Sequence, residues 1–272
     1  MNRIKASRMG QRNNIMVIKR DCICTPVGKN RPLHIYLPEG YEESEEQYPV
    51  MYFFDGHNLF SDEDATYGKC WGLKSFLDSW DKPVIIVGFE CGHEGDERLS
   101  EYSPYYFNSN YIGRVDGIGD EILRWITEEV KPMIDSEFRT YYFREATGIG
   151  GSSMGGLMAL YGAVRFNRFF SKAACLSPTV IPCYRKLKAD IRNAEPDQDT
   201  KLWLSFGESE AFARHKGRRI LEETKTFRYN TEFREMLENK NVSAKLHIQK
   251  KGRHCEADWE KQIPLFMDYL WK

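Results

Sequence analysis

One residue of this sequence that is suited to nucleophilic catalysis is Ser153, which lies between two glycines. Ser153 lies in the segment Gly151-Ser152-Ser153-Met154-Gly155, where the positions two before and two after it are glycine. In a sharp strand-to-helix turn, this Gly-x-Ser-x-Gly pattern projects the serine hydroxyl above a sheet. The helix that follows directs its positive end toward the serine. The pattern predicts Ser153 as a nucleophile, whereas Ser152 lacks the second glycine in its own frame.

A serine hydroxyl is a poor nucleophile until a nearby base takes its proton. In the strand-turn-helix setting of this motif, the acid and then the histidine follow the serine along the chain. His254 lies in a loop between a predicted strand and the last predicted helix, and we predict it as the general base. His247 lies inside that strand, where we expect a structural role. Three other histidines have no comparable placement: His34, His93 and His215.

The acid of the expected triad should follow the apolar strand predicted at residues 202–206. The next residues are Gly207, Glu208, Ser209 and Glu210, and either glutamate could orient the imidazole and stabilise its cation. We prefer Glu210. The alternative is that both carboxylates are solvated and that serine and histidine act as a dyad.

Acyl transfer also needs donors for the oxyanion of its tetrahedral intermediate, and each backbone N–H can contribute roughly 3–4 kcal/mol. One donor is the amide after the nucleophile, that of Met154. The other should lie after an early central strand, where Gly56 permits a turn that points the next amide inward. We therefore predict the N–H of His57 as the second donor. The His57 side chain could equally contact substrate or pack the loop.

Short apolar or alternating runs indicate the strands that would position these residues. We expect strands at residues 15–18, 33–37, 50–54, 84–89, 147–150, 172–176, 202–206 and 244–249. Helical spacing indicates helices at residues 116–130, 154–166, 229–238 and 256–271. The runs at 50–54 and 84–89 are almost wholly apolar, which suits strands buried on both faces of a parallel sheet.

Alternating strands and helices predict an α/β fold with a mainly parallel central sheet covered by helices on both faces. The first two strands could form an antiparallel hairpin at its edge. We expect one domain over residues 1–272, with a possible small cap or loop insertion around 198–230, where the sequence is charged and weakly patterned.

Composition narrows the class of protein further. The 39 basic and 40 acidic residues nearly balance, which argues against nucleic-acid or membrane-surface partners. Residues 1–14 lack the apolar run of a secretory signal, so a cytoplasmic protein is expected. The seven cysteines are irregularly spaced and are interpreted as mostly free thiols, and no metal site is predicted. The sequence leaves the oligomeric state open.

An aromatic segment after the strand at 84–89 should lie near the carboxyl edge of the sheet. It contains Tyr102, Tyr105 and Tyr106, whose flat rings with polar tips could clasp an aryl acyl group or a sugar. They are our candidate substrate-binding residues. The alternative is that they only pack a long loop.

Four spaced segments together resemble the esterase D-like family of α/β-hydrolases, which includes feruloyl, acetyl-xylan and siderophore esterases. These segments are residues 55–60, 101–104, 151–156 and 252–259, and the resemblance extends over about residues 30–272. It implies Ser153 as nucleophile, His254 as base, Glu210 as acid, and the amides of Met154 and His57 as oxyanion donors. The Gly-Glu-Ser-Glu segment departs from the family, because many members place an aspartate there.

The leading functional hypothesis is a serine esterase that hydrolyses a carboxylic ester through an acyl-enzyme. We expect a small-molecule, siderophore or carbohydrate ester as substrate, and neither a metal nor an organic cofactor is required. Acyl transfer to an alcohol would use the same triad. A non-catalytic binding module on a hydrolase scaffold is the alternative from another class, because a fold does not fix its function.

Overall fold

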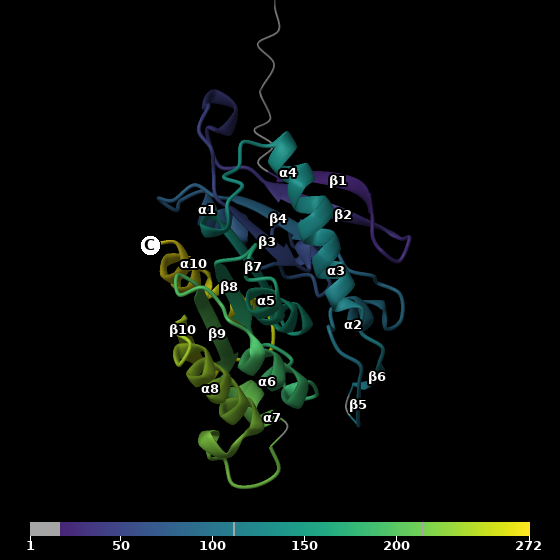
Figure 1. Cartoon of the computed structure of the whole chain (residues 1–272), viewed down its shortest axis with the longest axis vertical. Coiled ribbons are helices and arrows are strands. Elements are labelled where there is room, and N and C mark those ends of the chain that lie inside the picture. Colours follow the sequence, from purple (N-terminus) through teal and green to yellow (C-terminus); the bar gives the residue numbers. More distant parts are fainter. Residues whose placement is uncertain (1–16, 111, 214) are drawn as a thin grey trace, which may run out of the picture.

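The fold is built around one eight-stranded sheet, which the computed structural model describes together with the rest of residues 17–110, 112–213 and 215–272. The strands lie in the order β1-β2-β4-β3-β7-β8-β9-β10 (Figure 1). Strand β1 pairs antiparallel with β2, and β2 pairs antiparallel with β4, whereas the other neighbours are parallel. The bounds are β1 Val17–Cys24, β2 Asn30–Tyr36, β3 Val50–Phe54, β4 Ile85–Phe89, β7 Thr147–Ser152, β8 Lys172–Leu176, β9 Lys201–Gly207 and β10 Ser243–Gln249.

This topology confirms the predicted α/β fold with a mainly parallel sheet, and it confirms the antiparallel hairpin at the edge. Of the run predicted at 15–18, residues 15 and 16 lie outside the described part of the chain, and β1 continues to Cys24. A separate small hairpin pairs β5 (Phe107–Ser109) with β6 (Gly113–Val115).

Helices cover both faces of the sheet (Figure 1). None of the described helices is both long enough and apolar enough to cross a membrane. Their bounds are α1 Leu73–Leu77, α2 Glu97–Glu101, α3 Gly119–Trp125, α4 Lys131–Glu137, α5 Met154–Arg165, α6 Tyr184–Asn193, α7 Glu208–Ala213, α8 Lys225–Glu238, α9 Glu256–Glu260 and α10 Ile263–Trp271.

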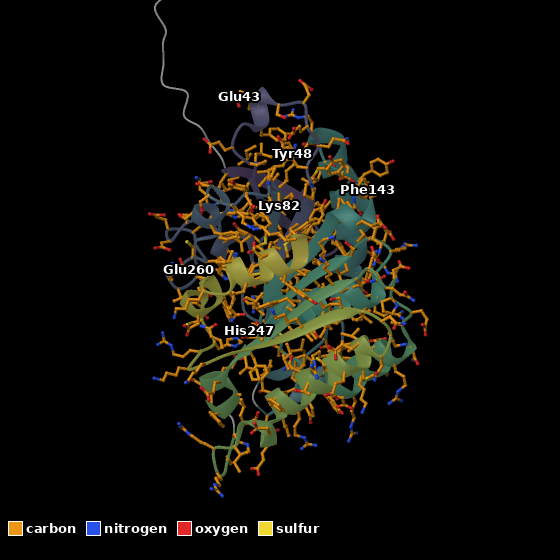
Figure 2. All side chains as sticks on the ribbon, turned by 90° about the vertical axis from the view of Figure 1, so that its left-hand side faces the viewer. Glu43, Tyr48, Lys82, Phe143, His247 and Glu260 are labelled. Atoms are coloured by element: carbon orange, nitrogen blue, oxygen red, sulfur yellow. The ribbon has the colours of Figure 1, made fainter. Side chains whose placement is uncertain are left out.

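Strand β3 shows how the sheet divides the core into two layers. All five of its residues are buried, and successive side chains point to opposite faces. Tyr52 and Phe54 belong to the larger apolar cluster, which contains the buried residues of α3, α5, α6 and α8. Met51 and Phe53 belong to the second cluster, which contains those of α1 and α10. Figure 2 faces the side of the molecule that carries α10. A strand buried on both faces explains the continuous apolar run in the sequence.

Three predicted helices have different bounds in the structure. The one expected at 116–130 begins at Gly119 as α3 and continues through the π-helical turn Ile126–Val130 into α4. The helix expected at 256–271 is divided into α9 and α10, because Pro264 has no N–H to donate and is accommodated in the first turn of a new helix. The helix expected at 229–238 begins earlier, at Lys225, where the Thr224 hydroxyl accepts a hydrogen bond from the Phe227 amide at 3.1 Å and caps the helix.

The stretch at 198–230 contains strand β9, helix α7 and the start of α8, joined by loops. Because the central strands are parallel, the carboxyl ends of β3, β4, β7, β8, β9 and β10 lie at the same edge of the sheet. Loops that leave these ends therefore meet above that edge, where ligands bind in open parallel sheets.

Candidate active site

Ser153 lies at the turn between β7 and α5, in a strained backbone conformation. Its φ of 57° and ψ of −118° are rarely adopted by a residue with a side chain. The turn is held from both sides, because the Ser153 amide donates to the Leu176 carbonyl at 2.9 Å and its carbonyl accepts from the Thr179 and Leu157 amides, each at 3.0 Å. The predicted strand-turn-helix context of Ser153 is therefore present.

The flanking glycines are needed because strand and helix approach closely at this turn. A Cβ on Gly151 would lie 2.7 Å from the Gly155 carbonyl carbon, and a Cβ on Gly155 would lie 2.8 Å from the Cβ of Phe54. Either contact is shorter than van der Waals packing allows, so larger residues would force the turn apart.

The Ser153 side chain faces a cavity of about 590 Å³ above the carboxyl edge of the sheet. Its hydroxyl lies 3.4 Å from that of Thr179. Ser152 is buried and does not line this cavity. The lining comprises the turn at Ser153 and six surrounding segments: Ser153, Met154, Ser177, Pro178, Thr179, Val180, Ile181, Pro182, Ser209, Glu210, Ala213, Thr226, Arg253, His254, Arg98, Leu99 and Ile112.

His254 and Glu210 line the same cavity and contact each other. His254 Nδ1 lies 3.3 Å from Glu210 Oε1, although Glu210 lies in α7 after β9 and His254 lies in the loop after β10. The Trp259 ring packs edge-on against the imidazole at a centroid distance of 5.0 Å. This arrangement leaves Nε2 of His254 as the ring nitrogen not engaged by the carboxylate.

The second carboxylate oxygen of Glu210 is also fixed. Oε2 accepts hydrogen bonds from the Ser177 hydroxyl at 2.8 Å and from the Gly207 amide at 3.3 Å. The Trp259 indole N–H in turn donates to the Ser177 hydroxyl at 3.0 Å. A carboxylate restrained at both oxygens holds one orientation toward His254, which is the role expected of an orienting acid.

Two close-packed loops bring His254 to Glu210. Strands β9 and β10 are parallel neighbours, and the loop after β10 passes so near Gly207 that a Cβ there would lie 2.3 Å from the Gly252 carbonyl oxygen. That oxygen accepts from the Ser209 amide at 3.0 Å and from the Glu210 amide at 3.3 Å. Glu208 is engaged elsewhere, because its carboxylate accepts a hydrogen bond from the Lys251 amide at 3.0 Å. The structure therefore brings Glu210, and not Glu208, to the imidazole.

The two predicted oxyanion donors are placed differently. Met154 begins α5 and lines the cavity beside Ser153. His57 lies in the short 3-10 turn Gly56–Asn58 after β3, and it is buried without being part of the cavity lining. The turn packs tightly on β4, since a Cβ on Gly56 would lie 2.5 Å from the Gly88 carbonyl carbon.

A buried ion pair anchors the loop that carries His57. The Asp55 carboxylate accepts two hydrogen bonds from Arg98, at 2.8 and 2.7 Å. Burial alone would raise the pKa of Asp55, but the charge and hydrogen bonds of Arg98 hold that pKa below its usual range. Arg98 also lines the cavity, so the pair connects the loop after β3 with the site.

None of the three candidate substrate-binding tyrosines lines the cavity that contains Ser153. The Tyr102 hydroxyl is buried, where it accepts from the Asp55 amide at 3.1 Å and donates to the Phe89 carbonyl at 3.3 Å. The Tyr105 hydroxyl donates to Asp190 at 2.6 Å. Tyr106 is half exposed and lines a different pocket. We therefore assign Tyr102 and Tyr105 to packing, and Arg98, Leu99 and Ile112 are the residues of this region in the cavity.

The loop after β8 is the part of the site that sequence reasoning missed. Residues 177–182 supply a third of the lining side chains and carry the Ser177 hydroxyl that holds Glu210. The one feature of the sequence that could have indicated residues 177–182 is their position directly after the strand predicted at 172–176. His247, in contrast, lies on β10 as expected (Figure 2). Its ring stacks on Trp203 at a centroid distance of 5.1 Å.

Comparison of the sequence with known proteins identifies the family to which the chain belongs. The family model described as "Putative esterase" matches residues 25–265. The chain is 24% identical to the uncharacterized protein YbbA of Bacillus subtilis, over 89% of this chain and 93% of YbbA. It is 29% identical to Esterase Rv1288 of Mycobacterium tuberculosis over 54% of this chain, a match that spans only 29% of that longer protein.

Solved structures share the fold at low sequence identity. An IroE-like serine hydrolase from Shewanella oneidensis superimposes with a TM-score of 0.71 and 21% identity, covering 93% of this chain and 78% of that one. The siderophore hydrolase EstA from Aspergillus nidulans gives a TM-score of 0.68 and 18% identity, with 100% of both chains covered.

The packing role of Tyr102 makes a prediction about stability. Tyr102→Phe leaves the Asp55 amide and the Phe89 carbonyl without their buried partner, so we expect the free energy of unfolding to fall by about 1–3 kcal/mol. Tyr106→Phe is the matched control at a half-exposed site, and it should change stability by less than about 0.5 kcal/mol. Urea unfolding followed by circular dichroism measures both. Equal stability of the two variants would contradict the packing role.

Proposed function

This chain belongs to the esterase family whose model it matches over residues 25–265, and on that premise we propose that it hydrolyses carboxylic esters through an acyl-enzyme formed on Ser153. The observation that carries the proposal is the convergence of Ser153, His254 and Glu210 on one cavity, with His254 Nδ1 held 3.3 Å from Glu210. A nucleophile, a base and a group that orients the base are the parts that acyl transfer requires.

In the proposed mechanism, Ser153 Oγ attacks the ester carbonyl while Nε2 of His254 takes its proton. Glu210 keeps Nδ1–H directed toward itself and stabilises the imidazolium that forms. The alcohol leaves with the proton returned by His254, and a water molecule then attacks the acyl-enzyme with His254 again acting as base. The acid is released and Ser153 regains its proton.

The tetrahedral intermediates carry their negative charge on the former carbonyl oxygen. We assign its stabilisation to the backbone N–H groups of Met154 and His57. Met154 opens α5, whose N-terminal end also favours negative charge there. The pairing of Asp55 with Arg98 fixes the turn that carries His57, and such preorganisation is what oxyanion donors require.

The cavity lining favours a small-molecule ester with an apolar or aryl acyl group. Leu99, Ile112 and Val180 provide apolar surface, whereas the two arginines of the lining, Arg98 and Arg253, are already paired with Asp55 and Asp258. Among the solved structures with this fold are siderophore hydrolases, and siderophore esters join the proposed substrate class on that ground, beside aryl esters of carbohydrates.

Removal of the nucleophile tests the reaction. Ser153→Ala should lower the turnover of p-nitrophenyl acetate by about 10⁴-fold or more, because the acyl-enzyme can no longer form. Ser152→Ala is the matched control at the neighbouring position and should retain most of the turnover. The same assay over methyl ferulate, acetylated xylan and a catecholate siderophore ranks the substrate classes. Unchanged turnover in Ser153→Ala would remove Ser153 from the mechanism.

The role of the acid is tested separately with two neighbouring glutamates. Glu210→Gln replaces the charge that faces His254, and we expect kcat/KM to fall by about 10²-fold or more. Glu208→Gln keeps the loop length and changes a carboxylate that contacts the Lys251 amide instead, so its kcat/KM should stay near that of the unmodified protein. Equal losses in both variants would argue that the glutamates act only through loop structure.

A further inference from the structure

Three potential metal ligands lie close together where the turn after β3 meets the segment after β4. They are His57 in that turn and Cys91 and His93 in the segment after β4, and one ligand atom from each lies within 4.8 Å of the others. Strands β3 and β4 are parallel neighbours, so the segments that leave their carboxyl ends meet at the same edge of the sheet. The close approach of Gly56 to Gly88 presses the two segments together.

His57 presents a ring nitrogen that has no protein partner. Its side chain is buried, with only 5% of the residue exposed, and Nε2 is paired with the Thr66 hydroxyl at 2.9 Å. Nδ1 is fully buried and has no hydrogen-bond partner among the described residues. When Nε2–H donates to Thr66, the lone pair of Nδ1 is free, and this is how outer groups usually orient a histidine that binds a metal.

The other two side chains complete a mixed nitrogen and sulfur set. Cys91 is buried and its thiol is not in a disulfide. The ring of His93 packs edge-on against that of His57 at a centroid distance of 4.8 Å. Nε2 of His93 lies 3.2 Å from a carboxylate oxygen of Glu90, whose other oxygen is 2.6 Å from His34 Nε2. A carboxylate behind a histidine is the second recurring feature of such sites.

We propose that His57, Cys91 and His93 bind one divalent cation of the zinc class. Two imidazoles and a thiolate suit zinc and its neighbours among the transition metals, whereas magnesium and calcium require oxygen ligands. In a tetrahedral zinc site the ligand atoms lie about 3.3–3.8 Å apart. The present spread of 4.8 Å exceeds that range, so at least one ligand must move when the ion binds, and His93, whose side chain is 54% exposed, has room to do so.

Water occupies the fourth position on the open side of His93, and the Cys91 thiol loses its proton to solvent when the ion binds. The ion then ties the turn after β3 to the segment after β4. If His57 supplies the second oxyanion donor, the ion also fixes that amide; this consequence rests on the proposed function, whereas binding itself does not.

Cobalt substitution tests the site directly in the full-length chain. After treatment with a chelator, Co²⁺ should bind with one ion per chain and give the thiolate-to-cobalt charge-transfer band and the strong visible bands of a tetrahedral ion. Zn²⁺ should displace it and abolish both. Cys91→Ser should remove the charge-transfer band, and His93→Ala should weaken Co²⁺ binding by about 10-fold or more.

Matched controls use a cysteine and a histidine from elsewhere in the fold. Cys24→Ser changes an exposed thiol, and His215→Ala changes a ring in the loop after α7, so both variants should bind Co²⁺ like the unmodified protein. Zn²⁺ should raise the melting temperature of the unmodified protein and not that of His93→Ala. Because the His93 side chain is half exposed, its removal should leave the fold intact. A band that survives Cys91→Ser, a band lost in Cys24→Ser, or the absence of stoichiometric binding would each overturn the proposal.

Discussion

The site depends on the close approach of strand β7 and helix α5 at Ser153. Only glycine fits at Gly151 and Gly155, because a Cβ at either position would overlap backbone or side-chain atoms at less than 3 Å. With the two elements so close, the intervening residue must take the strained φ of 57°. The strain is held by hydrogen bonds from the turn to β8 and to the loop after it. A hydroxyl that is positioned in this way needs no conformational search before it meets a substrate.

A second close approach positions the imidazole of His254. The end of β9 and the loop after β10 touch at Gly207 and Gly252. The Gly252 carbonyl accepts hydrogen bonds from the Ser209 and Glu210 amides. This contact places His254 and Glu210 side by side although 44 positions separate their numbers in the chain. The Ser177 hydroxyl then connects Glu210 to the loop after β8, so three neighbouring strands contribute to one hydrogen-bonded arrangement.

The sequence was sufficient for the fold, and it also named Ser153, His254 and Glu210, which the structure brings to one cavity, because those signals are local. The apolar run of β3, the glycines around Ser153 and the position of His254 after a strand each follow from a few adjacent residues. Side-chain direction was not predictable: Tyr102 lies in the expected segment, but its hydroxyl points into the core toward Asp55. The cluster of His57, Cys91 and His93 was missed for the same reason, since only the pairing of β3 with β4 brings it together.

The central claim is that Ser153 is the nucleophile and that His254 activates it. The most direct measurement is the reaction of the protein with a fluorophosphonate, with the adduct located by peptide mass spectrometry and its rate of formation followed in a His254→Ala variant. The account predicts a single phosphonylated residue, Ser153, and a rate that falls by about 10²-fold or more without the imidazole. Modification of a different serine, or an equal rate in the variant, would contradict it.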